Sequence, residues 1–151
     1  MNTKMVKTVC LLALLHMVPG ALAATFKTAD GATHDYAITG KGEALVMLHS
    51  GMMSRDDMHK QVTYFSKYYQ VIALDSREQG RSSTVDTQIS YQLMSDDVVA
   101  LLDHLKLKKA SLFGQSDGGI SALITAHKHP ERVDKLMIHG AVFNYKAYPA
   151  E

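Results

Sequence analysis

The sequence is nearly free of cysteine. Cys10 is the single cysteine among 151 residues, and it lies within an apolar N-terminal run. An intramolecular disulfide is therefore excluded, and beyond that run there is no thiol to act as a nucleophile. Tryptophan is absent and there are only three prolines. The chain has no low-complexity segment and no internal repeat, so we expect a single domain.

An excess of charge of either sign is also missing. Lysine and arginine number 16, and aspartate and glutamate number 15, which gives a formal net charge of +1. This balance provides no electrostatic attraction to nucleic acid or anionic lipid, so no nucleic-acid partner is expected. The histidines show no metal-ligand spacing supported by carboxylates, and we expect no metal ion and no cofactor.

The first 23 residues have the pattern of a secretory signal peptide. Lys4 and Lys7 form a basic start, residues 9–18 are an apolar core, and residues 21–23 (Ala-Leu-Ala) form a cleavage site. The apolar core is too short to span a bilayer comfortably. We therefore expect cleavage after Ala23 and an exported protein, periplasmic or secreted, with no membrane attachment once the signal is removed.

The remaining residues, 24–151, alternate between apolar runs and helical patterns. The predicted strands are residues 34–38, 44–48, 71–74, 110–113 and 135–139, and the helical patterns cover residues 58–69, 94–105 and 119–129. Ser90 or Ser95 lies near the start of the second helix. Strands that alternate with helices imply right-handed crossovers. The sequence thus predicts an α/β fold, with a mostly parallel sheet and helices on both faces.

Polar, glycine-containing segments follow four of the predicted strands, at residues 49–51, 75–80, 114–118 and 139–140. In a parallel sheet these carboxyl ends lie along one edge, where chemistry gathers. Residues 114–118 read Gly-Gln-Ser-Asp-Gly between a strand and a helix, which is the context of a nucleophile elbow. Such a turn strains the serine backbone, and Gly114 and Gly118 are expected because Cβ atoms two residues before and after the serine would collide across the bend. The alternatives are a connecting turn or a phosphate-binding loop, but no Lys-Ser/Thr pair follows the glycines.

A nucleophilic serine at position 116 needs hydrogen-bond donors for the oxyanion that forms when it attacks a carbonyl group. The backbone N–H of Asp117 lies at the start of the following helix, where N–H groups have no helical partner. We expect a second donor from the N–H of Gly51, with that of Ser50 as the fallback. The alternative for residues 51–53 is an ordinary strand-to-helix turn.

The motifs and their order resemble the N-terminal half of the α/β-hydrolase superfamily. The family's oxyanion turn, its Asp-x-Arg-Gly-x-Gly-x-Ser loop, its elbow and its His-Pro-Glu-Arg-Val turn are similar to residues 49–51, 75–82, 114–119 and 129–133. The resemblance implies a serine hydrolase that acts on a small-molecule ester or amide through an acyl-enzyme. It implies Ser116 as the nucleophile and the N–H groups of Gly51 and Asp117 as the oxyanion hole.

Two residues depart from the family pattern, because Ser50 and Glu78 stand where glycine is usual. A side chain there costs about 1 kcal/mol or more if φ is positive. The other polar residues are expected to be structural. His49 is expected to brace the oxyanion turn, and Asp75 and Arg77 to form a local ion pair.

The acid and the histidine of the family follow the elbow, in that order. We expect residues 24–151 to be the N-terminal part of a hydrolase domain, without its C-terminal strands, lid, acid and base. His139 is the best candidate base within the chain, but it occupies an apolar strand position. Asp134, His127 and His129 are expected at the opposite end of the sheet, and strand 135–139 as an open apolar edge.

Two alternatives stay open at this point. The chain fits a non-catalytic remnant or binding protein that keeps the fold without the triad. It also fits a lyase or a cofactor-free oxidase of the same fold, because one fold hosts many reactions.

Overall fold

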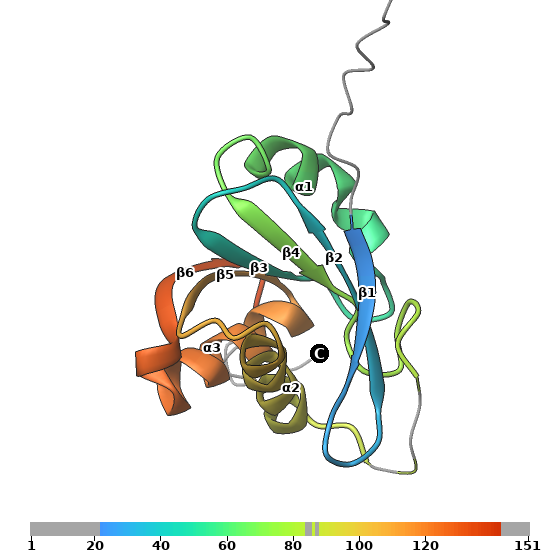
Figure 1. The fold of residues 1–151 in the computed structure, drawn as a ribbon. Coiled ribbons are helices and arrows are strands. Elements are labelled where there is room, and N and C mark those ends of the chain that lie inside the picture. The colour runs from blue at the N-terminus through green and yellow to red at the C-terminus, as the bar shows by residue number, and fades with distance from the viewer. Residues whose placement is uncertain (1–21, 84–85, 87, 143–151) are drawn as a thin grey trace, which may run out of the picture.

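The computed structural model describes residues 22–83, 86 and 88–142, and within them six strands form one mixed sheet (Figure 1). The strand order is β1-β2-β4-β3-β5-β6. Strands β4, β3, β5 and β6 run parallel, whereas β1 with β2 and β2 with β4 pair antiparallel. The predicted α/β class, with a mostly parallel sheet, is confirmed.

The bounds of the elements agree closely with the apolar runs of the sequence. The strands are β1 (Leu22–Lys27), β2 (Thr33–Thr39), β3 (Ala44–Leu48), β4 (Gln70–Leu74), β5 (Ala110–Gln115) and β6 (Val133–His139). The helices are α1 (His59–Phe65), α2 (Tyr91–His104) and α3 (Asp117–Lys128), with short 3-10 helices η1 (Arg55–Met58) and η2 (Pro130–Arg132).

Strand β1 is missing from the sequence prediction, which assigns its first two residues to the signal peptide. In the structure Leu22 pairs with Ile38 and Ala23 with Ala37. Residues 1–21 lie outside the described residues, so the signal peptide and its cleavage site stay predictions. Cleavage after Ala23 would leave Ala24 as the first residue of β1.

The helix starts follow from local capping. The hydroxyl of Ser90 accepts a hydrogen bond from the N–H of Leu93 (3.1 Å), so Ser90, not Ser95, caps α2. Helix α1 is shorter than the predicted 58–69. A capping box between Ser54 and Asp57 begins a 3-10 turn before it, and the helix ends at Phe65.

Helices cover both faces of the sheet, as predicted. Figure 1 shows α1 on one side and α2 and α3 on the other. Along β3, Val46 and Leu48 belong to the core beneath α2 and α3, whereas Leu45 and Met47 pack toward α1. A strand that is covered on both faces does not alternate between apolar and polar residues, which explains the continuous apolar run at 44–48.

Strand β6 forms the end of the sheet within the described residues, and it is exposed as expected. Leu136 is 37% exposed and Met137 is 47% exposed. A groove of about 280 Å³ lies between this strand and the side chains of Tyr69 and of Phe65, the last residue of α1.

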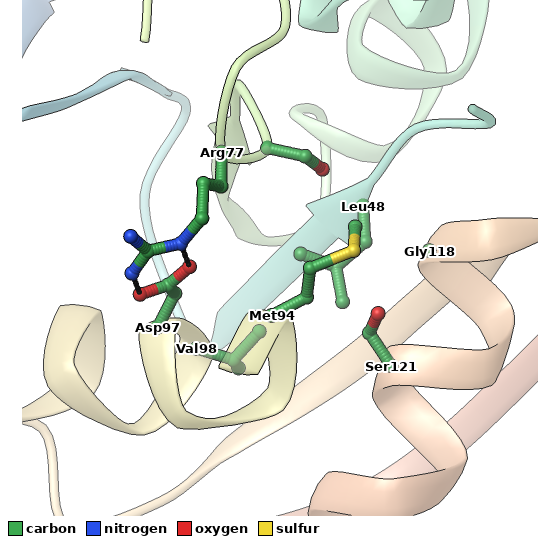
Figure 2. A pocket seen from close by; sticks show the side chains of 8 residues that line it. Leu48, Arg77, Met94, Asp97, Val98, Gly118 and Ser121 are labelled. Carbon is green, nitrogen blue, oxygen red and sulfur yellow. Dashed lines mark hydrogen bonds and ion pairs between the residues drawn. The ribbon is translucent and has the colours of Figure 1, made fainter. Parts of the chain in front are cut away.

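A buried ion pair joins the β4 loop to α2 (Figure 2). The Arg77 side chain is 1% exposed, and it donates two hydrogen bonds to Asp97, at 3.0 and 2.6 Å. It also donates to Asp30 in the β1–β2 turn (2.6 Å). The expected pair of Asp75 with Arg77 is therefore wrong. The buried Asp75 carboxylate instead contacts Arg55 and Arg81.

We predict that Asp97→Asn lowers the free energy of unfolding by about 3–5 kcal/mol, because it removes the buried carboxylate that pairs with the Arg77 guanidinium and leaves only the more exposed Asp30 as its counter-charge. Asp103→Asn is the matched control. Asp103 also pairs with an arginine, Arg132 (2.6 Å), but its side chain is 65% exposed, so its loss is expected to stay below about 1 kcal/mol. Denaturant unfolding of both variants measures the difference, and equal losses would contradict this assignment.

Candidate active site

The turn between β5 and α3 holds Ser116 in a strained backbone conformation. Its φ is 50° and its ψ is −115°, a combination that L-residues adopt at a cost of about 1–2 kcal/mol. The N–H of Ser116 donates to the carbonyl of His139 in β6 (2.9 Å), and its own carbonyl accepts from Ile120 in α3 (3.0 Å). The strained strand-turn-helix expected of an elbow is thus present.

The glycines of the turn leave room for close backbone contacts. A Cβ at Gly114 would collide with the backbone of Gly118 and lie 2.6 Å from the Cα of Gly119, which confirms the expected crowding across the bend. The reason for Gly118 differs from the one expected. Its Cβ would collide with the carbonyl of Leu48 and lie 2.6 Å from that of His49, at the end of β3. Gly118 therefore allows α3 to approach β3.

This approach brings the elbow against the turn that follows β3. The N–H of Gly118 donates to the carbonyl of His49 (3.2 Å). A Cβ on Gly51 would overlap the carboxylate of Asp117 and lie 2.9 Å from its Cγ. Among the described residues, the N–H groups of Gly51 and Asp117 have no hydrogen-bond partner. Two free donors on adjacent turns are the arrangement that an oxyanion requires.

His49 braces this turn, as expected. Its ring is buried, with Nδ1 2.7 Å from the carbonyl of Ser50. The other ring nitrogen, Nε2, accepts the N–H of Ser76 at the end of β4 (2.9 Å). Because Nε2 accepts, the proton is assigned to Nδ1, which donates to Ser50. A neutral imidazole thus connects the loops after β3 and β4.

Backbone strain gathers around these turns. Four non-glycine residues in the described part of the chain have positive φ, namely Met52, Glu78, Lys106 and Ser116. Ser50 does not, so the departure from glycine at position 50 causes no strain of this kind. Glu78 does, with φ 60°. Strained residues persist where the surrounding structure holds them, and such places are often functional.

A cleft of about 500 Å³ lies beside the elbow. It is lined by Met52, Met53, Glu78, Gln79, Gly80, Ile89 and Asp117. Met52 is fully exposed at its rim. Behind the start of α3, between Leu48, Met94 and Ser121, the remaining space is only about 10 Å³ (Figure 2). That space is at most large enough for one water molecule, so of these two spaces beside the described part of the elbow, the outer cleft is the one with room for a substrate.

One contact at the site has no signal in the sequence. The hydroxyl of Tyr91, the first residue of α2, donates to the carboxylate of Asp117 (2.9 Å). This hydrogen bond, together with burial and the negative charge of Asp117, raises the pKa of Tyr91. Sequence reasoning used Asp117 only for its N–H, because no local pattern indicates which residue its side chain meets across 26 positions.

The geometry agrees with comparisons of the sequence to known families. Residues 43–150 match the model of the alpha/beta hydrolase fold family. The chain belongs to the α/β-hydrolase family. It is 35% identical over 141 residues to serine hydrolase BPHL of Homo sapiens, covering 84% of this chain and 48% of that protein. It is 33% identical over 113 residues to 3-oxoadipate enol-lactonase 2 of Acinetobacter baylyi, covering 74% of this chain and 42% of that protein.

Solved structures of α/β-hydrolases superpose on this chain. One is Est816, described as an N-acyl homoserine lactone degrading enzyme, with a TM-score of 0.74 and 33% identity over 78% of this chain and 45% of that chain. A hydrolase from Pseudomonas aeruginosa superposes with a TM-score of 0.73 and 27% identity over 76% of this chain and 44% of that chain. The chain spans less than half the length of the curated relatives it matches.

The histidines of this α/β-hydrolase chain do not form a triad with Ser116 within the described residues. His139 lies at the end of β6 and contacts the elbow through its backbone carbonyl, and its exposed ring makes no hydrogen bond to Ser116. His127 and His129 lie at the far end of α3. Asp134 pairs with Lys109 and Lys135 at the start of β6. Residues 143–151 lie outside the described residues, and they contain no histidine.

Two further features are absent from the described part of the chain, a membrane-spanning helix and a cluster of metal ligands. No helix of residues 22–83, 86 and 88–142 is long and apolar enough to cross a membrane. Nor do these residues bring three histidine, cysteine, aspartate or glutamate side chains together as metal ligands.

We predict that Glu78→Gly raises the free energy of unfolding by up to about 1 kcal/mol, because glycine adopts positive φ without the steric penalty. Lys106→Gly is the matched control. Lys106 has φ 56° after the end of α2, away from the cleft, and is expected to gain a similar amount. Thermal or denaturant unfolding measures both changes. Loss of stability in Glu78→Gly alone would show that its carboxylate makes a stabilising contact.

Proposed function

We propose that this chain is part of a serine hydrolase that cleaves ester or amide bonds of small molecules, with Ser116 as the nucleophile. The observation that carries the proposal is the strained Ser116 backbone beside two unpaired N–H groups, those of Gly51 and Asp117. The relatives add support, because one is named a serine hydrolase and another an enol-lactonase. A lactone is a cyclic ester, and its cleavage breaks an acyl carbon–oxygen bond.

In the proposed reaction the Ser116 oxygen bonds to the carbonyl carbon of the substrate, and its proton passes to a histidine base. The carbonyl oxygen becomes an oxyanion that accepts hydrogen bonds from the N–H groups of Gly51 and Asp117. Each such donor lowers the barrier by about 3 kcal/mol. Collapse of the intermediate breaks the bond to the leaving alcohol or amine, which takes up the proton. Water then hydrolyses the acyl-enzyme and regenerates the serine.

We further propose that the histidine and its orienting carboxylate belong to a longer protein of which this chain is the N-terminal part. The proposal accounts for the absence of an acid–histidine pair at Ser116 among the described residues. The open edge at β6, with Leu136 and Met137 exposed, supports it, because further strands would cover these side chains. Export through the signal at residues 1–23 is proposed as well, and N-terminal sequencing of the mature protein would then begin at Ala24.

We predict that a fluorophosphonate probe labels Ser116 of the intact protein and that Ser116→Ala abolishes the label. Ser66→Ala is the matched control, because Ser66 lies at the end of α1 and only its neighbouring turn depends on it. Mass spectrometry of the labelled peptide identifies the modified residue. Persistent labelling in Ser116→Ala would refute the nucleophile. A folded wild-type protein that takes up no probe would instead favour the non-catalytic binding protein.

A further inference from the structure

The Tyr91–Asp117 hydrogen bond connects the starts of α2 and α3, two helices that also share a buried hydrogen bond between the hydroxyls of Ser95 and Thr125 (2.9 Å). Tyr91 is the first residue of α2, and the Ser90 cap fixes the backbone there. Asp117 is the first residue of α3 and immediately follows Ser116. The tyrosine hydroxyl lies 2.9 Å from Oδ1 of the aspartate, across 26 residues of sequence. The start of α2 therefore reaches directly to the elbow.

The Asp117 carboxylate, which accepts the hydrogen bond from Tyr91, lies against Gly51. Its second oxygen, Oδ2, fills the space that a side chain on Gly51 would take. The two N–H groups proposed to bind the oxyanion belong to these same two residues, Gly51 and Asp117. A carboxylate that turned toward them would accept their hydrogen bonds itself, or repel the negative charge that forms on the substrate. At a few ångströms such repulsion amounts to several kcal/mol near a protein surface.

We propose that Tyr91 is a positioning residue of this active site, whose hydroxyl anchors the Asp117 carboxylate against Gly51 and so keeps it off the N–H groups that bind the oxyanion. This role rests on the proposed serine hydrolase function. Tyr91 touches neither the substrate nor the nucleophile, and it acts only through Asp117. The hydrogen bond also disperses part of the negative charge of the Asp117 carboxylate, because a charge-assisted hydrogen bond draws electron density toward its donor.

The environment of Tyr91 suits this task. Its hydrogen bond to Asp117 raises its pKa, so the hydroxyl stays protonated and remains a donor at any pH where a hydrolase works. Tyr91 is 40% exposed, and replacement by phenylalanine keeps its ring, so removal of the hydroxyl alone leaves the packing of the core intact. Gly51 provides the space for the carboxylate on the other side.

The decisive experiment is a double-mutant cycle on the intact protein, with the rate of fluorophosphonate labelling at Ser116 as the readout. Tyr91→Phe removes only the hydroxyl. We expect it to lower the maximal labelling rate about tenfold, the effect of one hydrogen bond to a charged group. The probe concentration for half-maximal rate should change by less than about twofold. Adding Asp117→Asn to Tyr91→Phe should restore the rate, because the freed side chain no longer carries a charge.

Two measurements separate this role from a merely structural one. Tyr68→Phe is the matched control, since Tyr68 is 63% exposed beyond the end of α1 and its hydroxyl makes no hydrogen bond among the described residues. It should label at the wild-type rate. The pKa of Tyr91, followed by ¹³C NMR of ring-labelled tyrosine and assigned with Tyr91→Phe, should fall toward the ordinary tyrosine value in Asp117→Asn.

The outcomes distinguish this inference from the function on which it rests. If wild-type protein is not labelled at Ser116, both the hydrolase function and the role of Tyr91 are overturned. If wild type is labelled but Tyr91→Phe reacts at the same rate, only the positioning role fails. It also fails if Asp117→Asn does not rescue Tyr91→Phe, or if only the half-maximal concentration changes, which would make Tyr91 a contact of the probe.

Discussion

The proposed active site depends on the direct contact between the start of α3 and the carboxyl end of β3. Gly118 has no side chain, so its Cα lies against the carbonyls of Leu48 and His49, and its N–H donates to His49. A larger residue would push the helix away from the sheet. The N–H groups of Gly51 and Asp117 follow different strands, β3 and β5. Because the contact between α3 and β3 is so close, these two groups nevertheless lie on adjacent turns.

The strain at Ser116 is maintained by what surrounds it rather than by the turn alone. Residues held at unfavourable φ cost about 1–3 kcal/mol each, and Met52 and Glu78 add to the cost at neighbouring loops. Their loops are fixed by polar contacts that are buried or nearly so. His49 joins the turns after β3 and β4. The Asp75 carboxylate accepts the backbone N–H groups of Arg55 in η1 and of Arg81 in its own loop, and Arg77 connects that loop to α2.

Local patterns of the sequence were sufficient for the scaffold and for the strand-turn-helix around Ser116, the proposed nucleophile. The run at 44–48 is apolar because both faces are covered, and it coincides with β3. Gly114 is needed for a steric reason that acts within five residues, so this part of the turn was predictable, whereas Gly118 is needed for a contact with the distant end of β3. The proposed oxyanion donors likewise depend on two segments far apart in the chain.

The features that sequence reasoning missed are contacts between distant side chains. Arg77 pairs with Asp97 and Asp30, not with its neighbour Asp75, because its side chain points into the layer between β4 and α2. Tyr91 meets Asp117 only because two helix starts converge. Strand β1 was hidden because Leu22 and Ala23 fit a cleavage site equally well, and pairing with β2 is a property of the folded hairpin.

The most direct test of this account is a crystal structure of the intact protein after reaction with a phosphonate ester. The account predicts a covalent bond from phosphorus to the Ser116 oxygen, with the phosphoryl oxygen within hydrogen-bond distance of the backbone nitrogens of both Gly51 and Asp117. A phosphoryl oxygen turned away from both nitrogens, or an adduct on any other residue, would contradict it.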